Sequence, residues 1–152
     1  MDADHRAPVY ETGEIVVSAR PETVWDTLTD LRTWPQWIPG VKTMKVDEPV
    51  RVGTRFQWKA GPATIRSEIL ESERPYTVAW KGRTLGISAV HVWRMELEGE
   101  TTRVFTEESW SGLLARALRG SMRKTVRKAL DDALPALRRE AERRAESTLK
   151  ES

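Results

Sequence analysis

The chain has 152 residues, of which 39% are apolar, so a single domain can bury a core without disulfides or a metal. It contains no cysteine, which excludes a disulfide scaffold, thiol catalysis and thiolate metal sites. The net charge is only +2, because 25 Lys and Arg nearly balance 23 Asp and Glu, so the charge gives no argument for binding nucleic acid.

The first forty residues predict a polar leader, a strand and two short helices. Residues 1–9 are polar and precede the first hydrophobic pattern, so we expect a flexible leader. Apolar and polar residues then alternate over residues 13–19, which is typical of a half-buried strand. Pro21 suits the first turn of a helix and Glu22 its positive end. A second short helix or turn is expected over residues 31–37.

Between residues 41 and 112 the hydrophobic period changes to two. Segments with this alternation are separated by Pro or Gly, which predicts a meander of six strands. One face is apolar and the other charged, as in an antiparallel sheet covered on one side. The six segments are "VKTMKVD", "TRFQWKAG", "ATIRSEILES", "TVAWKG", "ISAVHVWRMEL" and "TRVFTEESW".

The last third of the chain predicts a long amphipathic helix that covers the sheet. Pro135 interrupts its apolar stripe and removes a backbone donor, so we expect a kink or break near residues 131–135. Beyond about Arg144 the chain turns polar and is expected to fray. The stripe consists of Leu114, Leu118, Met122, Val126, Leu130, Leu134, Leu137 and Ala141.

The early turns of this helix carry a basic face. We interpret it as a solvated helix face, with docking to an acidic partner or to an anionic membrane surface as the alternative. The face is formed by Arg116, Arg119, Arg123, Lys124, Arg127 and Lys128.

The element order predicts an α+β domain. A strand, two short helices, six strands and a long helix give a curved antiparallel sheet of about seven strands wrapped around a long C-terminal helix. Such a sheet and helix leave a cavity where neither closes completely on the other.

Five segments resemble the START-like, or SRPBCC, superfamily with its helix-grip fold, in particular its polyketide cyclase/dehydrase-like branch. The resemblance covers nearly the whole chain and predicts one such domain over residues 10–148. It implies a small bacterial protein that binds a hydrophobic molecule, but that superfamily includes enzymes, carriers and receptors, so the shared fold does not fix a function. The segments are "SARPETVWDTLTDLRTWPQWIPGV", "VGTRFQWKAG", "ERPYTVAWKG", "GISAVHVW" and "TRVFTEESWSG".

A histidine and a carboxylate are predicted to face each other on the covered side of the sheet. If "LEGETT" closes a hairpin with a two-residue or a four-residue loop, Leu97 pairs with Thr102 in either case. Counting back along both strands places His91 opposite Glu108, near enough for a hydrogen bond. This pair is the candidate acid/base group, although the two side chains could also simply satisfy each other in the core. A register slip of one residue would bring in Glu107 instead.

Seven tryptophans against two Phe and two Tyr suggest a cavity lined by indole rings, with filling of the core as the alternative. Apolar and hydroxyl side chains on the covered face and beside it complete the candidate ligand-binding set. The set is Trp34, Trp37, Phe56, Trp58, Ser67, Trp80, Trp93, Met95, Thr106, Trp110 and Met122.

The resulting hypothesis is a protein that binds a hydrophobic, aromatic or polyketide-like molecule and catalyses its cyclisation or dehydration with His91 and Glu108. The alternative is a non-catalytic carrier or sensor of a lipid or secondary metabolite. We expect no metal, since His91 is the one histidine outside the leader and a metal site needs several ligands that converge. We expect no cofactor, since the sequence has no phosphate-binding loop. No apolar run approaches the about 20 residues of a membrane span, so we expect no transmembrane segment and a cytoplasmic protein. We also expect a monomer or homodimer that binds no nucleic acid.

Overall fold

The computed structural model describes residues 1–151 and forms seven strands with helices on one side of the sheet. The strands are β1 (Val9–Val17), β2 (Val41–Lys45), β3 (Arg55–Ala60), β4 (Ala63–Glu73), β5 (Thr77–Thr84), β6 (Ile87–Glu98) and β7 (Thr101–Ser111). The helices are α1 (Pro21–Thr29), the 3-10 helix η1 (Leu31–Thr33), α2 (Trp34–Trp37), α3 (Leu113–Ala117) and α4 (Arg119–Glu151).

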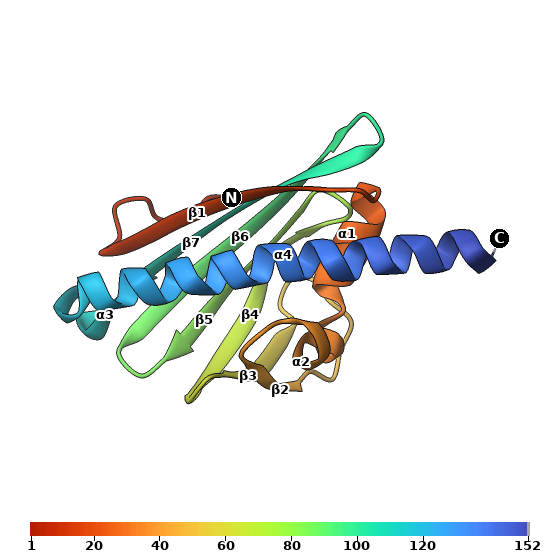
Figure 1. Cartoon of the computed structure of the whole chain (residues 1–152). Helices are drawn as coiled ribbons and strands as arrows, with labels where there is room; N and C mark the ends of the chain where they lie inside the picture. Colours follow the sequence, from red (N-terminus) through yellow and green to blue (C-terminus); the bar gives the residue numbers. More distant parts are fainter. Residues whose placement is uncertain (152) are drawn as a thin grey trace.

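All neighbouring strands are antiparallel, in the order β1-β7-β6-β5-β4-β3-β2. Figure 1 shows α4 lying across one face of this sheet, with α1 and α2 beside its C-terminal half and α3 at its start. The predicted α+β helix-grip fold is therefore confirmed.

The hairpin of β6 and β7 has the predicted register. Its loop has two residues, Gly99 and Glu100, because Glu98 pairs with Thr101. Gly99 has a φ of 63°, a left-handed conformation that glycine adopts without strain. His91 consequently pairs with Glu108.

Helix α4 differs from its prediction. It continues through Pro135 to Glu151, so the expected break near residues 131–135 and the fraying beyond Arg144 are absent from the described helix. Proline removes only one backbone donor, so only the carbonyl of Asp131 loses its helical partner. Asp131 is solvent-exposed, so water can hydrogen bond to this carbonyl. The interruption lies earlier, at Leu118, which separates α3 from α4.

The N-terminal leader also differs from its prediction, because it lies against the outer face of the sheet. Ala3 is buried, and its backbone N–H donates to Glu107 Oε1 at 2.7 Å. The N–H of Asp4 donates to Ser109 Oγ at 3.2 Å. The first strand begins at Val9, earlier than the alternation indicated, because it pairs with the full length of β7.

The main core fills the space between the sheet and the C-terminal half of α4. Trp34 lies at its centre, with ring centroids of Trp58 at 5.3 Å and Trp80 at 5.4 Å. From α4, Leu134, Leu137 and Ala141 close this core. The other half of the covered face is packed differently and contains the candidate site.

Candidate functional site

A cavity of about 480 Å³ lies between the covered face of the sheet and the first turns of α4. Several of its wall positions carry very small side chains. Gly82 is one of them: a Cβ atom there would lie 3.1 Å from both Ile65 Cγ2 and Ser67 Oγ. The cavity exists because such small side chains do not fill the space between the sheet and the helix. The small wall residues are Ala60, Ala63, Gly82, Ala89 and Ala129.

Glu108 is the carboxylate on this apolar wall. Its strand β7 pairs with β6, and the row of inward side chains runs from Trp80 through His91 to Glu108. The Glu108 side chain is 14% exposed, so its carboxyl lies in a largely dry environment. A carboxyl at such a position can exchange a proton with a bound molecule.

His91 lies behind Glu108 rather than on the cavity wall. Its ring contacts those of Trp80 on β5 and Trp93 on its own strand, with both ring centroids 5.0 Å away. Its Nδ1 atom is 3.5 Å from Glu108 Oε1. The cavity wall therefore includes Glu108 and Trp80, the two cross-strand neighbours of His91, but not His91 itself.

The hydrogen bonds around Thr106 assign the tautomer of His91. Thr106 Oγ1 donates its proton to the backbone carbonyl of Val92 at 3.1 Å. The same oxygen lies 2.8 Å from His91 Nε2, and with its one proton directed at Val92 it accepts the hydrogen bond there. In this arrangement neutral His91 carries its proton on Nε2, which leaves Nδ1 as an acceptor facing Glu108.

Burial favours the neutral form of both groups. It lowers the pKa of His91 to about 3, since the flanking indoles exclude water from the imidazolium. It raises the pKa of Glu108 to about 7, and the indole N–H of Trp110 opposes this rise. Near neutral pH, Glu108 is thus poised to give or take a proton, while His91 stays uncharged.

Two further polar groups belong to residues of the cavity wall. Trp110 is two residues from Glu108 on β7, and its buried N–H favours the charged form of the Glu108 carboxyl. Ser67 Oγ accepts a hydrogen bond from Trp58 Nε1 at 3.1 Å, which leaves the hydroxyl proton of Ser67 available. The carboxyl of Glu108 and the hydroxyl of Ser67 are polar groups on an apolar wall that can bind ligand oxygen atoms.

The structure divides the predicted site residues into two groups. The cavity is lined by Trp58, Ser67, Trp80, Glu108, Trp110 and Met122. The others lie outside the wall, because they occupy the packed half of the covered face, the helices beside it or the layer behind Glu108. This second group is His91, Trp34, Trp37, Phe56, Trp93, Met95 and Thr106.

Sequence reasoning missed most of the small and turn residues of the wall. Gly82 and Ala89 had a usable signal, because they continue the inward alternation of their strands and pair with each other. Residues of the β5–β6 turn and of α3 gave no such signal. The missed wall residues are Ala60, Pro62, Ala63, Ile65, Gly82, Arg83, Thr84, Leu85, Ile87, Ala89, Leu114, Thr125 and Ala129.

The described residues hold no group of three or more His, Asp or Glu side chains that could bind a metal ion. Among the helices described, none is both long and apolar enough to cross a membrane.

Residues 11–142 match the family model described as "Polyketide cyclase / dehydrase and lipid transport". No curated protein matches the chain in sequence.

Three solved structures illustrate the similarity of the fold. A hypothetical protein from Helicobacter pylori is 18% identical, with a TM-score of 0.80 and 90% of each chain covered. The Zhui aromatase/cyclase from a Streptomyces species is 17% identical, with a TM-score of 0.77, over 89% of this chain and 94% of that one. A protein from Thermus thermophilus is 21% identical, with a TM-score of 0.70, over 91% of this chain and 98% of that one.

Proposed function

Because the chain belongs to the polyketide cyclase/dehydrase and lipid transport family, we propose that it binds a hydrophobic, aromatic or polyketide-like molecule in the cavity. We further propose that it catalyses cyclisation or dehydration of this molecule, with Glu108 as the acid/base group. The observation that carries the proposal is a carboxyl with a pKa of about 7 on the wall of an apolar cavity.

The cavity suits a ligand of moderate size. Its volume of about 480 Å³ lies within the range of small-molecule sites. Trp58, Trp80 and Trp110 offer flat apolar surfaces for ring stacking. The carboxyl of Glu108 would bind an oxygen atom of the ligand, which favours ketones and phenols over plain hydrocarbons.

Dehydration of a β-hydroxy ketone illustrates the chemistry. The Glu108 carboxylate takes a proton from the carbon between the carbonyl and the hydroxyl-bearing carbon, and the electron pair forms an enolate. The enolate electrons then form the carbon–carbon double bond as the C–O bond breaks, and the Glu108 proton goes to the departing hydroxide to form water. Trp110 Nε1 would stabilise the Glu108 carboxylate that takes the proton.

His91 acts in this proposal as a positioning residue. Its Nδ1 lone pair lies 3.5 Å from Glu108 Oε1 and would accept the proton of the neutral carboxyl, which would fix the carboxyl oxygen that faces the cavity. Neutral His91 places no positive charge beside the carboxyl, so the pKa of Glu108 stays high.

A carrier that does no chemistry is the second candidate. It is favoured by the scarcity of ionisable groups in the cavity, where Glu108 lies among apolar residues and Arg83 occupies an outward-facing strand position. In a carrier, Glu108 would only recognise an oxygen of the cargo.

The test uses the β-hydroxy ketone formed from benzaldehyde and acetone, whose dehydration to benzalacetone is followed by absorbance. We expect the wild-type protein to accelerate the reaction and Glu108→Gln to lower kcat by about 100-fold or more, since an amide cannot carry the proton. Glu107→Gln is the matched control, because Glu107 is 13% exposed but lies on the outer face of the sheet.

Binding is measured separately by anthraquinone quenching of tryptophan fluorescence. Wild-type and Glu108→Gln proteins that bind anthraquinone alike without accelerating dehydration would leave the carrier function and exclude the catalytic one. Native mass spectrometry of the purified protein would show the mass of any molecule that copurifies.

A further inference from the structure

Two leucines project into solvent at the mouth of the cavity. Leu85, in the turn between β5 and β6, is 90% exposed, and Leu113, the first residue of α3, is 85% exposed. Leu118, which follows α3, is 46% exposed. Exposed apolar side chains that lie together on neighbouring segments form an apolar patch, and such a patch marks a candidate interaction surface.

The two exposed leucines belong to one rigid ridge. The N–H of Leu114 donates to the carbonyl of Gly86 at 3.1 Å, which ties α3 to the β5–β6 turn. A Cβ atom at Gly86 would lie only 2.7 Å from Leu114 Cβ, and one at Gly112 only 2.6 Å from the carbonyl oxygen of Gly86. Both glycines have positive φ, so the sequence permits this close approach and holds Leu85 and Leu113 outward together.

Basic residues surround the ridge. Residues 111–130 contain six Lys and Arg and no Asp or Glu, whereas residues 131–144 contain four of each. On the outer face of the sheet, Arg66 pairs directly with Arg83, a like-charge arrangement that destabilises an isolated sheet. Cations therefore flank the leucines on both the sheet side and the helix side.

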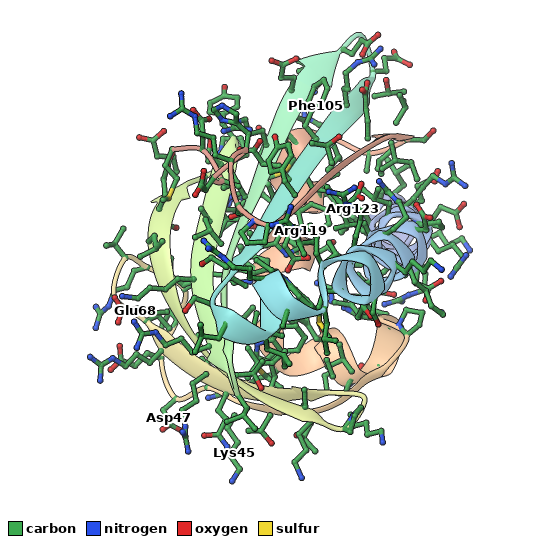
Figure 2. All side chains as sticks on the ribbon, turned by 90° about the vertical axis from the view of Figure 1, so that its left-hand side faces the viewer. Lys45, Asp47, Glu68, Phe105, Arg119 and Arg123 are labelled. Carbon is green, nitrogen blue, oxygen red and sulfur yellow. The ribbon has the colours of Figure 1, made fainter. Side chains whose placement is uncertain are left out.

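Many of these cations have no internal partner. Within the part of the chain that the structure describes, no carboxylate lies within 4.0 Å of Arg83, Arg116, Arg119 or Lys124. Arg123 has a carboxylate partner, Glu11, but at the long distance of 3.9 Å. Figure 2 faces this end of the molecule, with α3 nearest the viewer and Arg119 and Arg123 labelled beside it.

The ridge and the cavity are continuous. Leu85, Leu114 and Met122 line the cavity, and the exposed side chain of Leu85 extends from its wall to the outside. A surface that covers the ridge would therefore lie against the mouth of the cavity.

We propose that this end of the protein docks on an anionic lipid bilayer. Leu85 and Leu113 enter the interfacial region, while the surrounding arginines contact lipid phosphates. A hydrophobic ligand would then pass between the bilayer and the cavity without crossing water. The docking itself does not depend on catalysis by Glu108.

The shape of the surface favours a bilayer over an acidic protein. The leucines stand at the tips of a turn and a short helix, so they form a convex ridge rather than a groove that would receive a helix or strand. Cations on both sides of the ridge match a laterally extended anionic surface.

The test is cosedimentation of the full chain with vesicles of phosphatidylcholine containing about 30% phosphatidylglycerol, a strongly anionic surface. We expect binding that weakens in high salt and is at least tenfold weaker to pure phosphatidylcholine. Because each cation near an anionic surface contributes about a fivefold change, the double variant Arg116→Gln/Arg119→Gln should weaken binding at least tenfold. Leu85→Ser/Leu113→Ser should do the same through lost apolar contact.

Matched controls keep the result specific. Arg138→Gln/Arg139→Gln makes the same charge change at exposed positions farther along α4, and Val52→Ser removes a 64% exposed apolar side chain from the β2–β3 loop. Both should bind vesicles like the wild type.

The proposal is overturned by equal binding to neutral and anionic vesicles, by equal losses in the test and control variants, or by no binding at millimolar lipid. Failure of vesicle binding with intact dehydration activity would remove the docking proposal alone. Intact vesicle binding without dehydration would remove only the catalytic proposal.

Discussion

The two halves of the covered sheet face are made by the same strands under the same helix, yet one is solid and the other hollow. Beneath the C-terminal half of α4, Trp34, Phe56 and Trp80 interlock with Leu134 and Leu137. Beneath its first turns, small residues such as Gly82 and Ala89 face α4 across a cavity. Alternation of polar and apolar residues decides which face is buried, and side-chain volume decides whether the buried space is filled.

The largest expected effect tests this difference in packing. Leu137→Ala in the solid half should lower the free energy of unfolding by about 3 kcal/mol, because Leu137 is fully buried and its removal leaves a void. Met122→Ala at the cavity wall should cost less than about 1 kcal/mol, because the space beside it is already empty. Urea unfolding measures both, and equal losses would contradict a packing difference between the two halves.

The next effect is on pH-dependent stability. The pKa of Glu108 is about 7 in the folded state against 4.5 ordinarily, so its contribution to the free energy of unfolding falls as the pH rises through that window. The pKa of His91 is about 3 against 6.5, so its contribution rises with pH between those values. The two contributions oppose each other and cancel between about pH 4.5 and 6.5.

Glu108→Gln separates the two contributions. It removes the cost of ionising a carboxyl in the hollow half, so it should raise the free energy of unfolding by about 3 kcal/mol at pH 8 and by almost nothing at pH 4. Urea unfolding of both proteins across this pH range gives the comparison. A stability difference between the two proteins that is the same at pH 4 and pH 8 would show that the carboxyl is not desolvated.

Filling the hollow half should abolish its capacity for ligands. Gly82→Val adds three carbons at a site where even a Cβ would contact Ile65 and Ser67 at 3.1 Å. We expect anthraquinone affinity to fall by about tenfold or more, because the added side chain occupies space in the cavity. The substitution Val52→Ser, far from the cavity, serves as the control for fluorescence quenching.

The smallest expected effect concerns the tautomer of His91. Thr106→Val removes the acceptor of the His91 Nε2 proton, so the imidazole is free to carry its proton on Nδ1 and donate to Glu108. The pKa of Glu108 should then fall, and the midpoint of the pH–rate profile with it, by about one unit. Thr106→Ser, which keeps the hydroxyl, should restore the wild-type midpoint; a midpoint unchanged in the valine variant would refute the assigned tautomer.

The fold was largely predictable, because strand alternation, helical spacing and turn residues are local signals. The register of His91 and Glu108 followed from the "LEGETT" loop, since both loop lengths considered give the same pairing. The prediction failed at Pro135, where packing of Leu134 and Leu137 holds α4 together despite the lost hydrogen bond.

The candidate site was less predictable. Large aromatic residues drew attention to the solid half, where Trp34 and Trp93 are core residues. The cavity instead exists because Gly82 has no side chain and Ala89 only a methyl group. Whether a void forms depends on the side-chain volumes of several strands and a helix taken together. No pattern within one segment reports that sum.

The two-residue turn at Gly99 and Glu100 has a consequence for acid strength. Glu107 and Glu108 are neighbours in sequence and almost equally exposed, at 13% and 14%. Burial acts to raise the pKa of both, but hydrogen bonds from Tyr10, Ala3 and Arg94 outweigh it for Glu107, whose pKa falls. Glu108 has no such set of donors, and its pKa rises. An insertion or deletion of one residue at this distant turn would exchange the two environments: Glu107 would become the weak acid on the cavity wall, and Glu108 would move to the hydrogen-bond donors of the outer face.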